Sequence, residues 1–384
     1  MARLLFLFLI VTFVTPVLAA YDKPYIGEII KYRAKHEDTF VHLARDYNLG
    51  FTEMRAANPY VDPWLPGKGT ELILPARHLL PDAGREGVVI NLPEMRLYAF
   101  IHGDDAPSTF PIGIGREGLN TPEGITKVTR KKEGPTWTPT PRMRREDPEL
   151  KPYYPPGPDN PLGTHALYLG WPTYAIHGTN KPFGIGRRIS SGCIRMYPEN
   201  IQALYELIPV GTRVQVVNQP IKLAWINNRL YLEAHPEMEQ AIQMEEYGVV
   251  SAPKLSEEDL KRIIRVAGAN EEKLRWPAIR MAIKERAGYP VEIARRSGSF
   301  SEKDEAEIIK EAEDEVVGID DQSEQDNDAL EDVAMVEEAS DSDEENVPNE
   351  QTNGQDAIDE IIGTDIEDYI PVQESGLTNT NFNP

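Results

Sequence analysis

The run Tyr174-Ala-Ile-His-Gly-Thr-Asn180, followed by Arg188-Ile-Ser-Ser-Gly-Cys-Ile-Arg-Met-Tyr197, decides how the rest of the chain is interpreted. It contains Cys193, the only cysteine among 384 residues, and His177, which lies 16 positions earlier. A thiol is a strong nucleophile only as the thiolate, so it needs a base nearby in the fold, and imidazole has a suitable pKa. We therefore predict that Cys193 is a catalytic nucleophile and His177 its base. The alternative is that Cys193 is a small buried hydrophobic residue.

The residues that flank Cys193 suit acyl transfer. Ser190, Ser191 and Gly192 precede the thiol, and glycine lets a bound carbonyl approach the backbone, where N–H groups can stabilise an oxyanion. In an extended segment alternate residues share a face, so Cys193 and Arg195 are expected to point the same way. Arg195 then offers a cation to a substrate carboxylate. Its alternative role is a structural ion pair.

Residues 86–220 have the pattern of a mostly β domain, a sandwich or barrel with one main helix. Short alternating or β-branched segments are separated by turns rich in proline and glycine. We expect strands at 88–91, 96–101, 108–112, 125–129, 166–169, 174–176 and 213–217. Residues 198–208 are expected to form the helix, because Pro198 suits a first turn and Ile201, Leu204, Tyr205 and Ile208 share one face.

Two segments of this domain allow more than one interpretation. Gly113-Ile-Gly-Arg-Glu-Gly118 matches a dinucleotide-binding fingerprint, but that fingerprint needs a helix directly after it, and Asn120-Thr-Pro-Glu-Gly124 forces a turn. We interpret it as a tight turn between strands. Residues 130–163 form a long proline-rich insertion, which is uncommon unless it covers a site. We predict a substrate-binding lid there, with a passive ordered flap as the alternative.

The first 20 residues have the layout of a cleaved secretory signal. Arg3 precedes the largely apolar run Leu4–Leu18, and small residues follow it. The run of 15 residues is shorter than the ~20 that a spanning helix needs, although an uncleaved anchor is the alternative. We expect no further membrane segment, and we expect the mature protein to act in the space outside the inner membrane.

The regions on either side of the β domain have different patterns. Residues 31–76 are predicted to form a small α+β module in the order strand, helix, helix, strand, with Asp38 as a helix N-cap. Residues 221–297 are predicted to form a short helical region with helices at 237–246, 256–267 and 277–287, and with a strand at 230–233.

Residues 298–384 are expected to be a disordered acidic tail. From 301 onward the chain has 29 acidic residues against Lys303 and Lys310, a net charge of −27. Because the whole chain carries −23, residues 1–300 carry +4. A mildly basic folded part is compatible with a polymer rich in carboxylates. No basic stripe interleaved with aromatic residues argues for nucleic acid.

The motif around Cys193 resembles that of the YkuD-type L,D-transpeptidases, in particular the periplasmic ErfK/YbiS branch. Ile176-His-Gly-Thr-Asn180 and Ser190-Ser-Gly-Cys-Ile-Arg-Met196 carry the resemblance. Many relatives have histidine where this chain has Ser191. The similarity extends through the segments 91–98, 121–124, 155–163 and 210–212, so it covers roughly 86–220. Residues 31–76 resemble a LysM module, a small glycan-binding domain, in which glutamate stands for the usual glycine at position 37.

The resemblance implies an L,D-transpeptidase that needs no cofactor and acts on peptidoglycan. Cys193 would take an acyl group from a tetrapeptide stem with release of D-Ala. The Gly178 carbonyl would orient the imidazole of His177. Thr179, Ser190, Ser191, Gly192 and Arg195 are the expected substrate-binding residues.

The acceptor and the degree of activity stay open at this stage. An amine of a second stem gives 3-3 cross-links, the lysine of an outer-membrane lipoprotein gives wall anchoring, and water makes the protein an L,D-carboxypeptidase. A LysM peptidoglycan-binding protein with little or no transferase activity is the alternative from another class. We expect no metal site, because the seven histidines lack paired-ligand spacing and the cysteine is alone.

Overall fold

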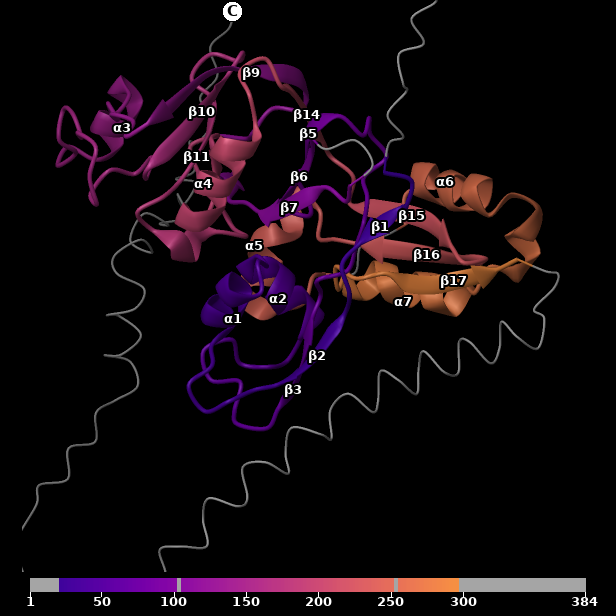
Figure 1. The fold of residues 1–384 in the computed structure, drawn as a ribbon. Coiled ribbons are helices and arrows are strands. Elements are labelled where there is room, and N and C mark those ends of the chain that lie inside the picture. The colour runs from indigo at the N-terminus through magenta and orange to yellow at the C-terminus, as the bar shows by residue number, and fades with distance from the viewer. Residues whose placement is uncertain (1–20, 102–104, 252–254, 297–384) are drawn as a thin grey trace, which may run out of the picture. The chain divides into compact units, whose positions relative to one another are not determined.

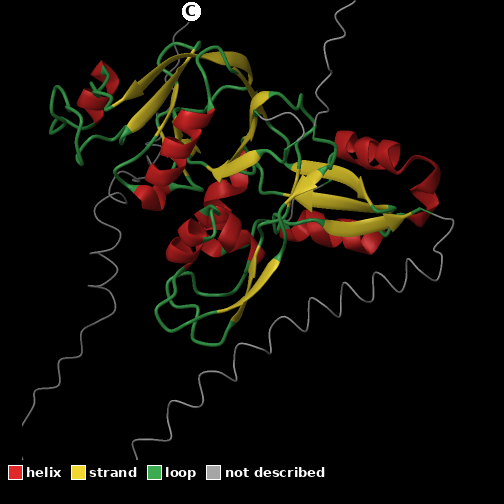
Figure 2. Cartoon of the chain, viewed as in Figure 1, coloured by secondary structure: helices red, strands yellow, loops and turns green. Residues whose placement is uncertain are grey.

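The computed structural model describes residues 21–101, 105–251 and 255–296 (Figures 1 and 2). The signal predicted at 1–20 and the acidic tail predicted at 298–384 lie outside these residues. We divide the described chain into an N-terminal module (21–80), a sheet domain (81–220) and a C-terminal region (221–296). Of the helices within the described residues, none has both the length and the apolar character needed to span a bilayer.

The N-terminal module has the predicted order of strand, two helices and strand. Strand β2 (Ile30–Arg33) pairs antiparallel with β3 (Glu71–Leu74), and α1 (Phe40–Asp46) and α2 (Phe51–Ala57) lie between them in the chain. A short pair, β1 (Tyr25–Ile26) and β4 (His78–Leu79), flanks the module. Apolar side chains of both helices pack with those of β3 in one core, namely Phe40, Val41, Leu43, Ala44, Phe51, Met54, Leu72 and Leu74.

The predicted N-cap of the first helix is wrong by one residue. Thr39 caps α1, because its hydroxyl accepts a hydrogen bond from the His42 N–H at 3.3 Å. The Asp38 carboxylate instead accepts from the Lys35 N–H at 2.7 Å and from the Tyr32 hydroxyl at 2.8 Å. Asp38 therefore closes the preceding turn.

One eight-stranded mixed sheet forms the sheet domain, in the order β13-β11-β10-β9-β14-β5-β6-β7. The strands are β5 (Gly87–Asn91), β6 (Arg96–Phe100), β7 (Ser108–Pro111), β9 (Gly124–Glu133), β10 (His165–Leu169), β11 (Ala175–His177), β13 (Ile194–Arg195) and β14 (Arg213–Val217). The sheet curls until Gly113, two residues beyond β7, exchanges two backbone hydrogen bonds of 2.9 Å with Arg195. The predicted sandwich or barrel is thus a single sheet that one residue pair closes.

The glycine-rich segment after β7 leads into a turn, as predicted, and no helix follows it directly. Strand β8 (Ile114–Gly115) pairs in parallel with β12 (Arg188–Ser190), which directly precedes the residues around Cys193. A short 3-10 helix, η1 (Pro182–Gly184), lies between β11 and β12. The segment therefore has a structural role beside Cys193. It lacks the helix that must follow directly in a dinucleotide-binding site.

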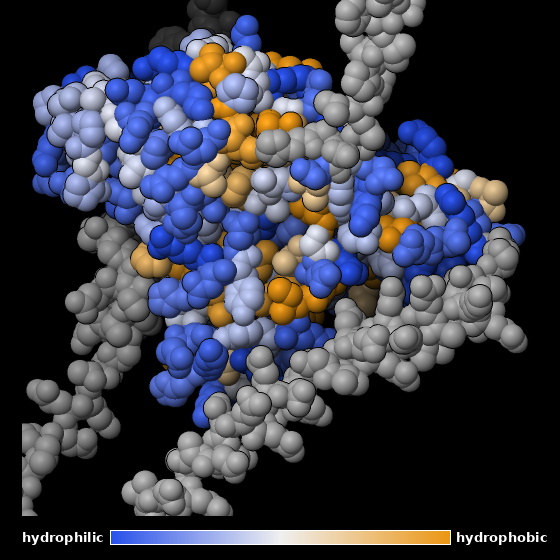
Figure 3. Space-filling model, in the orientation of Figure 1, coloured by the Kyte–Doolittle hydropathy of each residue, from blue (hydrophilic) through white to orange (hydrophobic). Residues whose placement is uncertain are grey.

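The main predicted helix is confirmed as α4 (Pro198–Leu207), with Pro198 in its first turn. Ile201 and Leu204 are fully buried, and they join the inward-facing residues of the sheet in the largest apolar core of the described chain. The face in Figure 3 is mostly hydrophilic, with smaller apolar areas between. Packing of this core holds α4 against β10 and so supports the sheet edge that carries β11.

The insertion at 130–163 is an ordered flap and not a structureless loop. Strand β9 runs into it as far as Glu133, and it contains a short helix, α3 (Pro141–Glu146). Trp137 and Tyr154 form an antiparallel bridge with backbone hydrogen bonds of 3.0 and 2.8 Å. The amide nitrogen of Asn160 donates to the carbonyls of Pro135, Tyr154 and Pro155, which ties the base of the flap together.

The C-terminal region is not purely helical, which corrects the prediction for 221–297. Strands β15 (Ile221–Ile226), β16 (Arg229–Ala234) and β17 (Val291–Arg295) form an antiparallel sheet. Its helices are η2 (Met238–Gln240), α5 (Ala241–Tyr247), α6 (Glu257–Ala267), η3 (Gly268–Lys273) and α7 (Trp276–Glu285). Only the strand at 230–233 was predicted. Helix α5 packs against α2, so this region contacts the N-terminal module as well.

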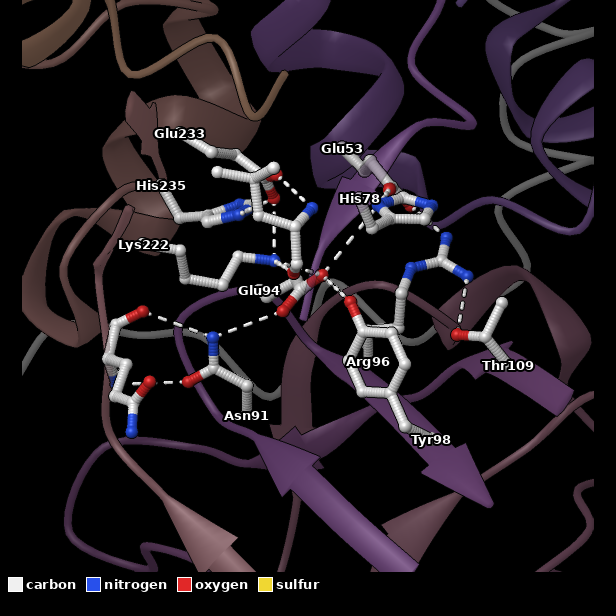
Figure 4. Close-up of polar contacts among 12 residues, drawn as sticks. Glu53, His78, Asn91, Glu94, Arg96, Tyr98, Thr109, Lys222, Glu233 and His235 are labelled. Atoms are coloured by element: carbon white, nitrogen blue, oxygen red, sulfur yellow. Dashed lines mark hydrogen bonds and ion pairs between the residues drawn. The ribbon is translucent and has the colours of Figure 1, made fainter. Parts of the chain in front are cut away.

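A buried cluster of charged side chains joins these three parts (Figure 4). Glu53 of α2 pairs with Arg96 of β6 at 2.6 Å. Lys222 of β15 pairs with Glu94 at 2.8 Å and with Glu233 of β16 at 2.6 Å. All five side chains are at most 5% exposed. A buried charge is costly without its partner. These pairs therefore help to hold the N-terminal module, the sheet domain and the C-terminal region together.

Candidate active site

Parallel pairing of two short strands places the predicted base beside the segment that follows the predicted nucleophile. Strand β11 pairs with β13 so that Ile176 lies opposite Ile194 and His177 opposite Arg195. Paired residues of adjacent strands share a face, so His177 and Arg195 are on the same face of the sheet. Ile194 is fully buried on the other face, as predicted. Cys193 lies directly before β13, so the thiol is at the start of one strand and the imidazole is on the last residue of its parallel partner.

His177 is held in one tautomer by its neighbour. It is 4% exposed, and its Nδ1 lies 2.6 Å from the Gly178 carbonyl oxygen. A carbonyl can only accept, so Nδ1 carries the proton and Nε2 of the neutral ring keeps its lone pair. Burial, and then the charge of Arg195, lower the pKa of His177 to about 3. The ring is thus neutral at ordinary pH and able to accept a proton.

The Cys193 thiol is half-buried and lies among backbone groups. Its Sγ donates to the Thr173 carbonyl at 3.4 Å. Burial raises the pKa of the thiol, whereas a hydrogen bond from the Ala175 N–H and the charge of Arg195 oppose that rise. Thr173 has a φ of 70°, a left-handed conformation that is uncommon for threonine and that turns the backbone there. The resting pair is therefore an uncharged thiol and an uncharged imidazole.

Two of the predicted substrate-binding residues, Ser190 and Gly192, form hydrogen bonds within the loop before Cys193. The Ser190 hydroxyl, which is 1% exposed, donates to the Cys193 carbonyl at 2.5 Å and accepts from the Gly192 N–H at 3.1 Å. Ser190 therefore shapes the loop and does not face a substrate. The Gly192 N–H, expected to stabilise an oxyanion, is thus already occupied by a hydrogen bond within the loop. Ser191 is partly exposed at the turn.

The remaining predicted residues lie on either side of this loop. Arg195 is partly exposed and lies opposite His177. Thr179 is buried in a turn in which its hydroxyl contacts the backbone of Lys181. Thr179 and Asn180 also line a cavity of ≈ 560 Å³ with Gly134, Pro156 and His165, at the base of the flap. Its volume is in the range of small-molecule sites.

Two backbone groups of this site, the Ala175 N–H and the Thr173 carbonyl, were not predicted. Every residue has such groups, so a sequence pattern carries no signal for them. The left-handed φ of Thr173 depends on how the turn between β10 and β11 closes. Only the fold could show that this turn brings both groups to the thiol.

One further group of side chains has the composition of a metal site, but the charge of a lysine already neutralises its carboxylates. Ligand atoms of His78, Glu94 and Glu233 lie within 4.8 Å of one another. The Lys222 ammonium bridges Glu94 and Glu233, so it lies where a cation would be bound (Figure 4). We assign no metal to these residues.

Comparison with known proteins identifies the family of the chain. A family model described as the L,D-transpeptidase catalytic domain, YkuD, matches residues 85–216. The probable L,D-transpeptidase YbiS of Escherichia coli is 42% identical over 259 residues, which are 66% of this chain and 82% of YbiS. The probable L,D-transpeptidase ErfK/SrfK of the same organism is 48% identical over 184 residues, 47% of this chain and 59% of that protein.

A third relative and a solved structure extend the comparison. The probable L,D-transpeptidase YcfS of E. coli is 43% identical over 209 residues, 52% of this chain and 65% of YcfS. The catalytic domain of an L,D-transpeptidase from E. faecium is 22% identical and covers 36% of this chain and 100% of that domain, at a TM-score of 0.28. The sequence relatives alone are decisive: this chain belongs to the YkuD family of cysteine-dependent L,D-transpeptidases and, within it, to the ErfK/YbiS branch.

Proposed function

We propose that the protein transfers the acyl group of a peptidoglycan tetrapeptide stem to an amine through a thioester on Cys193. One observation carries the proposal: parallel pairing of β11 with β13 places the neutral imidazole of His177 beside the segment that begins after the half-buried Cys193, and the Ala175 N–H supports the sulfur. The first step forms a bond between Sγ and the carbonyl carbon that precedes the terminal D-Ala. The thiol proton moves to Nε2 of His177 as this bond forms.

His177 then returns the proton. The C–N bond to D-Ala breaks, the leaving amine takes the proton from the imidazolium, and the thioester remains on Cys193. An acceptor amine attacks the thioester, His177 accepts its proton, and the thiolate leaves and is reprotonated. The Gly178 carbonyl keeps Nδ1 protonated throughout, because it offers that nitrogen only an acceptor.

Charged and polar groups around the thiol fit this substrate. The Cys193 N–H is suited to stabilise the oxyanion of each tetrahedral intermediate. Arg195 favours the thiolate and offers a cation to a stem carboxylate. The cavity bounded by Thr179, Asn180 and the base of the flap is the proposed binding space for a stem peptide, with the flap as its cover. Ser191 lies at the edge of the same loop.

The N-terminal module is proposed to bind glycan strands of the wall, because its strand, helix, helix, strand order matches a LysM module. Such binding would keep the enzyme on its polymeric substrate in the periplasm. The acceptor is proposed to be an amine, either that of a second stem or that of a lipoprotein lysine. Both acceptors react through a primary amine. A single assay with each acceptor in turn can therefore compare their rates of transfer.

A product assay tests the proposed function. Purified protein is incubated with disaccharide-tetrapeptides, alone or with an amine acceptor, and the products are identified by mass spectrometry. We expect loss of D-Ala with a 3-3 dimer or an acceptor adduct, and neither with Cys193→Ala. Release of D-Ala without transfer would show a carboxypeptidase. Retention on wall sacculi by both proteins, with no reaction, would show a binding protein instead.

A further inference from the structure

The hydroxyl of Thr121 connects two turns that lie against the nucleophile. Thr121 is 2% exposed and opens the segment Thr121-Pro-Glu-Gly124. Its Oγ1 donates a hydrogen bond to the Gly192 carbonyl at 2.9 Å. The same oxygen accepts one from the Gly115 N–H at 3.1 Å. Both bonds of this buried hydroxyl are thus made to backbone groups, one of them directly before Cys193.

The bond to the Gly192 carbonyl determines where the Cys193 N–H points. The Gly192 carbonyl and the Cys193 N–H belong to one peptide unit, which is planar and trans. They therefore point in opposite directions, so a carbonyl held toward Thr121 turns the N–H away from Thr121. Among the described residues the Cys193 N–H makes no hydrogen bond, whereas the Gly192 N–H is taken by Ser190. The Cys193 N–H is thus the donor of this loop that stays available, and the hydrogen bond of the Gly192 carbonyl fixes its direction.

The turn that carries Thr121 is itself held firmly. The Arg116 N–H donates to the Ser190 carbonyl at 2.9 Å, next to the pairing of β8 with β12. A Cβ on Gly115 would lie 2.1 Å from the Leu119 carbonyl oxygen, so the close fold of this turn requires glycine. The Arg188 guanidinium donates to the Asn120 side chain at 2.9 Å. The turn and the nucleophile loop therefore behave as one packed unit.

We propose that Thr121 is a positioning residue that holds the Gly192–Cys193 peptide so that the Cys193 N–H faces the developing oxyanion. The inference rests on the proposed acyl transfer, and it gives the Gly113–Gly118 turn and the Thr121-Pro-Glu-Gly124 segment their role at this site. Thr121 touches neither the sulfur nor the imidazole. Its effect is therefore confined to steps in which a carbonyl oxygen becomes negative.

The test compares two reactions of the same thiol. Acylation by a disaccharide-tetrapeptide passes through an oxyanion, whereas alkylation by iodoacetamide displaces iodide and forms none. Thr121→Val keeps the shape and removes the hydroxyl. We expect its acylation rate to fall by roughly tenfold to a hundredfold, less than the loss of a whole oxyanion donor, while its alkylation rate stays at the wild-type value. Both rates are measured by intact-protein mass spectrometry.

Two control variants show whether a loss of acylation results only from impaired folding. Thr121→Ser keeps the hydroxyl and should restore acylation. Thr129→Val removes a hydroxyl that donates to the carbonyls of Tyr168 and Leu169, away from the loop, and should leave both rates unchanged. If Thr121→Val does not fold, Thr121→Ala is used, and the same selective loss of acylation is expected. Melting temperatures are compared for all of these variants.

The outcomes separate this inference from the proposed function. If the wild-type protein is not acylated, the proposed function fails. If it is acylated, and Thr121→Val is acylated equally fast or loses acylation and alkylation in parallel, the positioning role is wrong. A selective loss of acylation with rescue by Thr121→Ser supports it.

Discussion

Cys193 and His177 both start from their uncharged forms in this structure. Burial disfavours the thiolate of Cys193 and the imidazolium of His177. The charge of Arg195 further disfavours the imidazolium because it has the same sign, and the hydrogen bond to the Gly178 carbonyl opposes these effects without reversing them. The proton therefore moves as the substrate is attacked. Ser191, near Cys193 in the sequence, cannot serve as a base at ordinary pH, so His177 is the base in the proposed mechanism.

The low pKa of His177 predicts activity in acid. A base with a pKa of about 3 stays unprotonated, and so able to accept the thiol proton, until the pH falls to that value. We expect the acid limb of kcat/KM for the acylation step to lie far below 6.5, the usual pKa of histidine. The pH profile of acylation measures this, with circular dichroism at each pH as the control for unfolding. An acid limb centred near pH 6.5 would contradict the proposed environment of His177.

A residue of this site could be predicted from the sequence only where the identity of its side chain indicates its chemical role. Cys193, His177 and Arg195 are recognisable because few residue types can supply a nucleophile, a base and a fixed cation. Ser190 was assigned to the substrate, yet its hydroxyl bonds the loop backbone. A small hydroxyl residue beside a glycine suits both roles, and only the direction of its χ1 separates them.

At the scale of elements, seven strands of the sheet domain were predicted, the shortest of them the three-residue β11, whereas β8, β12 and β13 were not. Strands such as β9 and β14 alternate over five residues or more, which is long enough for a pattern of period two. Strands β8, β12 and β13 have two or three residues, and no periodicity is readable over that length. The site is nevertheless built from these short strands. The C-terminal strands β15 and β17 were missed because their flanking helical patterns dominated the interpretation.

The loop before Cys193 gives a prediction at this scale. Gly192 has a φ of 108°, and a Cβ on it would lie 2.9 Å from a ring carbon of Tyr174. Gly192→Ala should therefore strain the turn by about 1–3 kcal/mol and displace the thiol. We expect acylation to fall by about a hundredfold. Gly211→Ala is the matched control, because its φ of 97° is similar but nothing lies within 4 Å of the added Cβ. Equal acylation rates for the two variants would contradict this account of the turn.

At the scale of the whole described chain, buried ion pairs join parts that are distant in the sequence. Glu53 pairs with Arg96, 43 positions away, and Glu94 pairs with Lys222. No local pattern indicates such partners, since an isolated Glu or Lys in a sequence is usually a surface residue. This is why the sequence predicted a short helical region at 221–297 without indicating how it is joined to the rest of the chain. Its first two strands in fact supply Lys222 and Glu233 to the shared cluster (Figure 4).

Removal of one charge from this cluster should be costly. Lys222→Met leaves Glu94 and Glu233 buried without their shared cation, and we expect the free energy of unfolding to fall by about 3–5 kcal/mol. Lys261→Met is the control, because Lys261 pairs with Glu257 on the surface and is 65% exposed. That pair should contribute less than about 1 kcal/mol. Urea denaturation of both variants measures the difference, and similar losses would show that the cluster does not hold the parts together.

His78 makes this junction sensitive to pH. Burial, together with Arg96, Lys222 and His235, holds the pKa of His78 well below its usual value, although the carboxylates of Glu53 and Glu94 lie 3.5 and 3.6 Å from Nδ1. Because the folded state disfavours the imidazolium, the stability that neutral His78 provides is present above pH 6.5 and is lost as the pH falls below it.

The comparison with His78→Gln isolates this contribution. Between pH 7.5 and 5.5 the wild-type protein should lose about 1.4 kcal/mol more unfolding free energy than the variant, since one proton binds the unfolded histidine alone. Urea denaturation at both pH values measures the two losses. A loss of equal size in wild type and variant would show that His78 titrates alike in both states.

The acyl-enzyme itself is the most direct test of the account. Purified protein is mixed with a disaccharide-tetrapeptide, quenched in acid and mapped by mass spectrometry. The account predicts an adduct on Cys193 with the mass of the donor minus that of alanine, absent in Cys193→Ala and formed far more slowly in His177→Gln. Release of D-Ala without any adduct on Cys193, or an adduct that forms equally fast in His177→Gln, would contradict it.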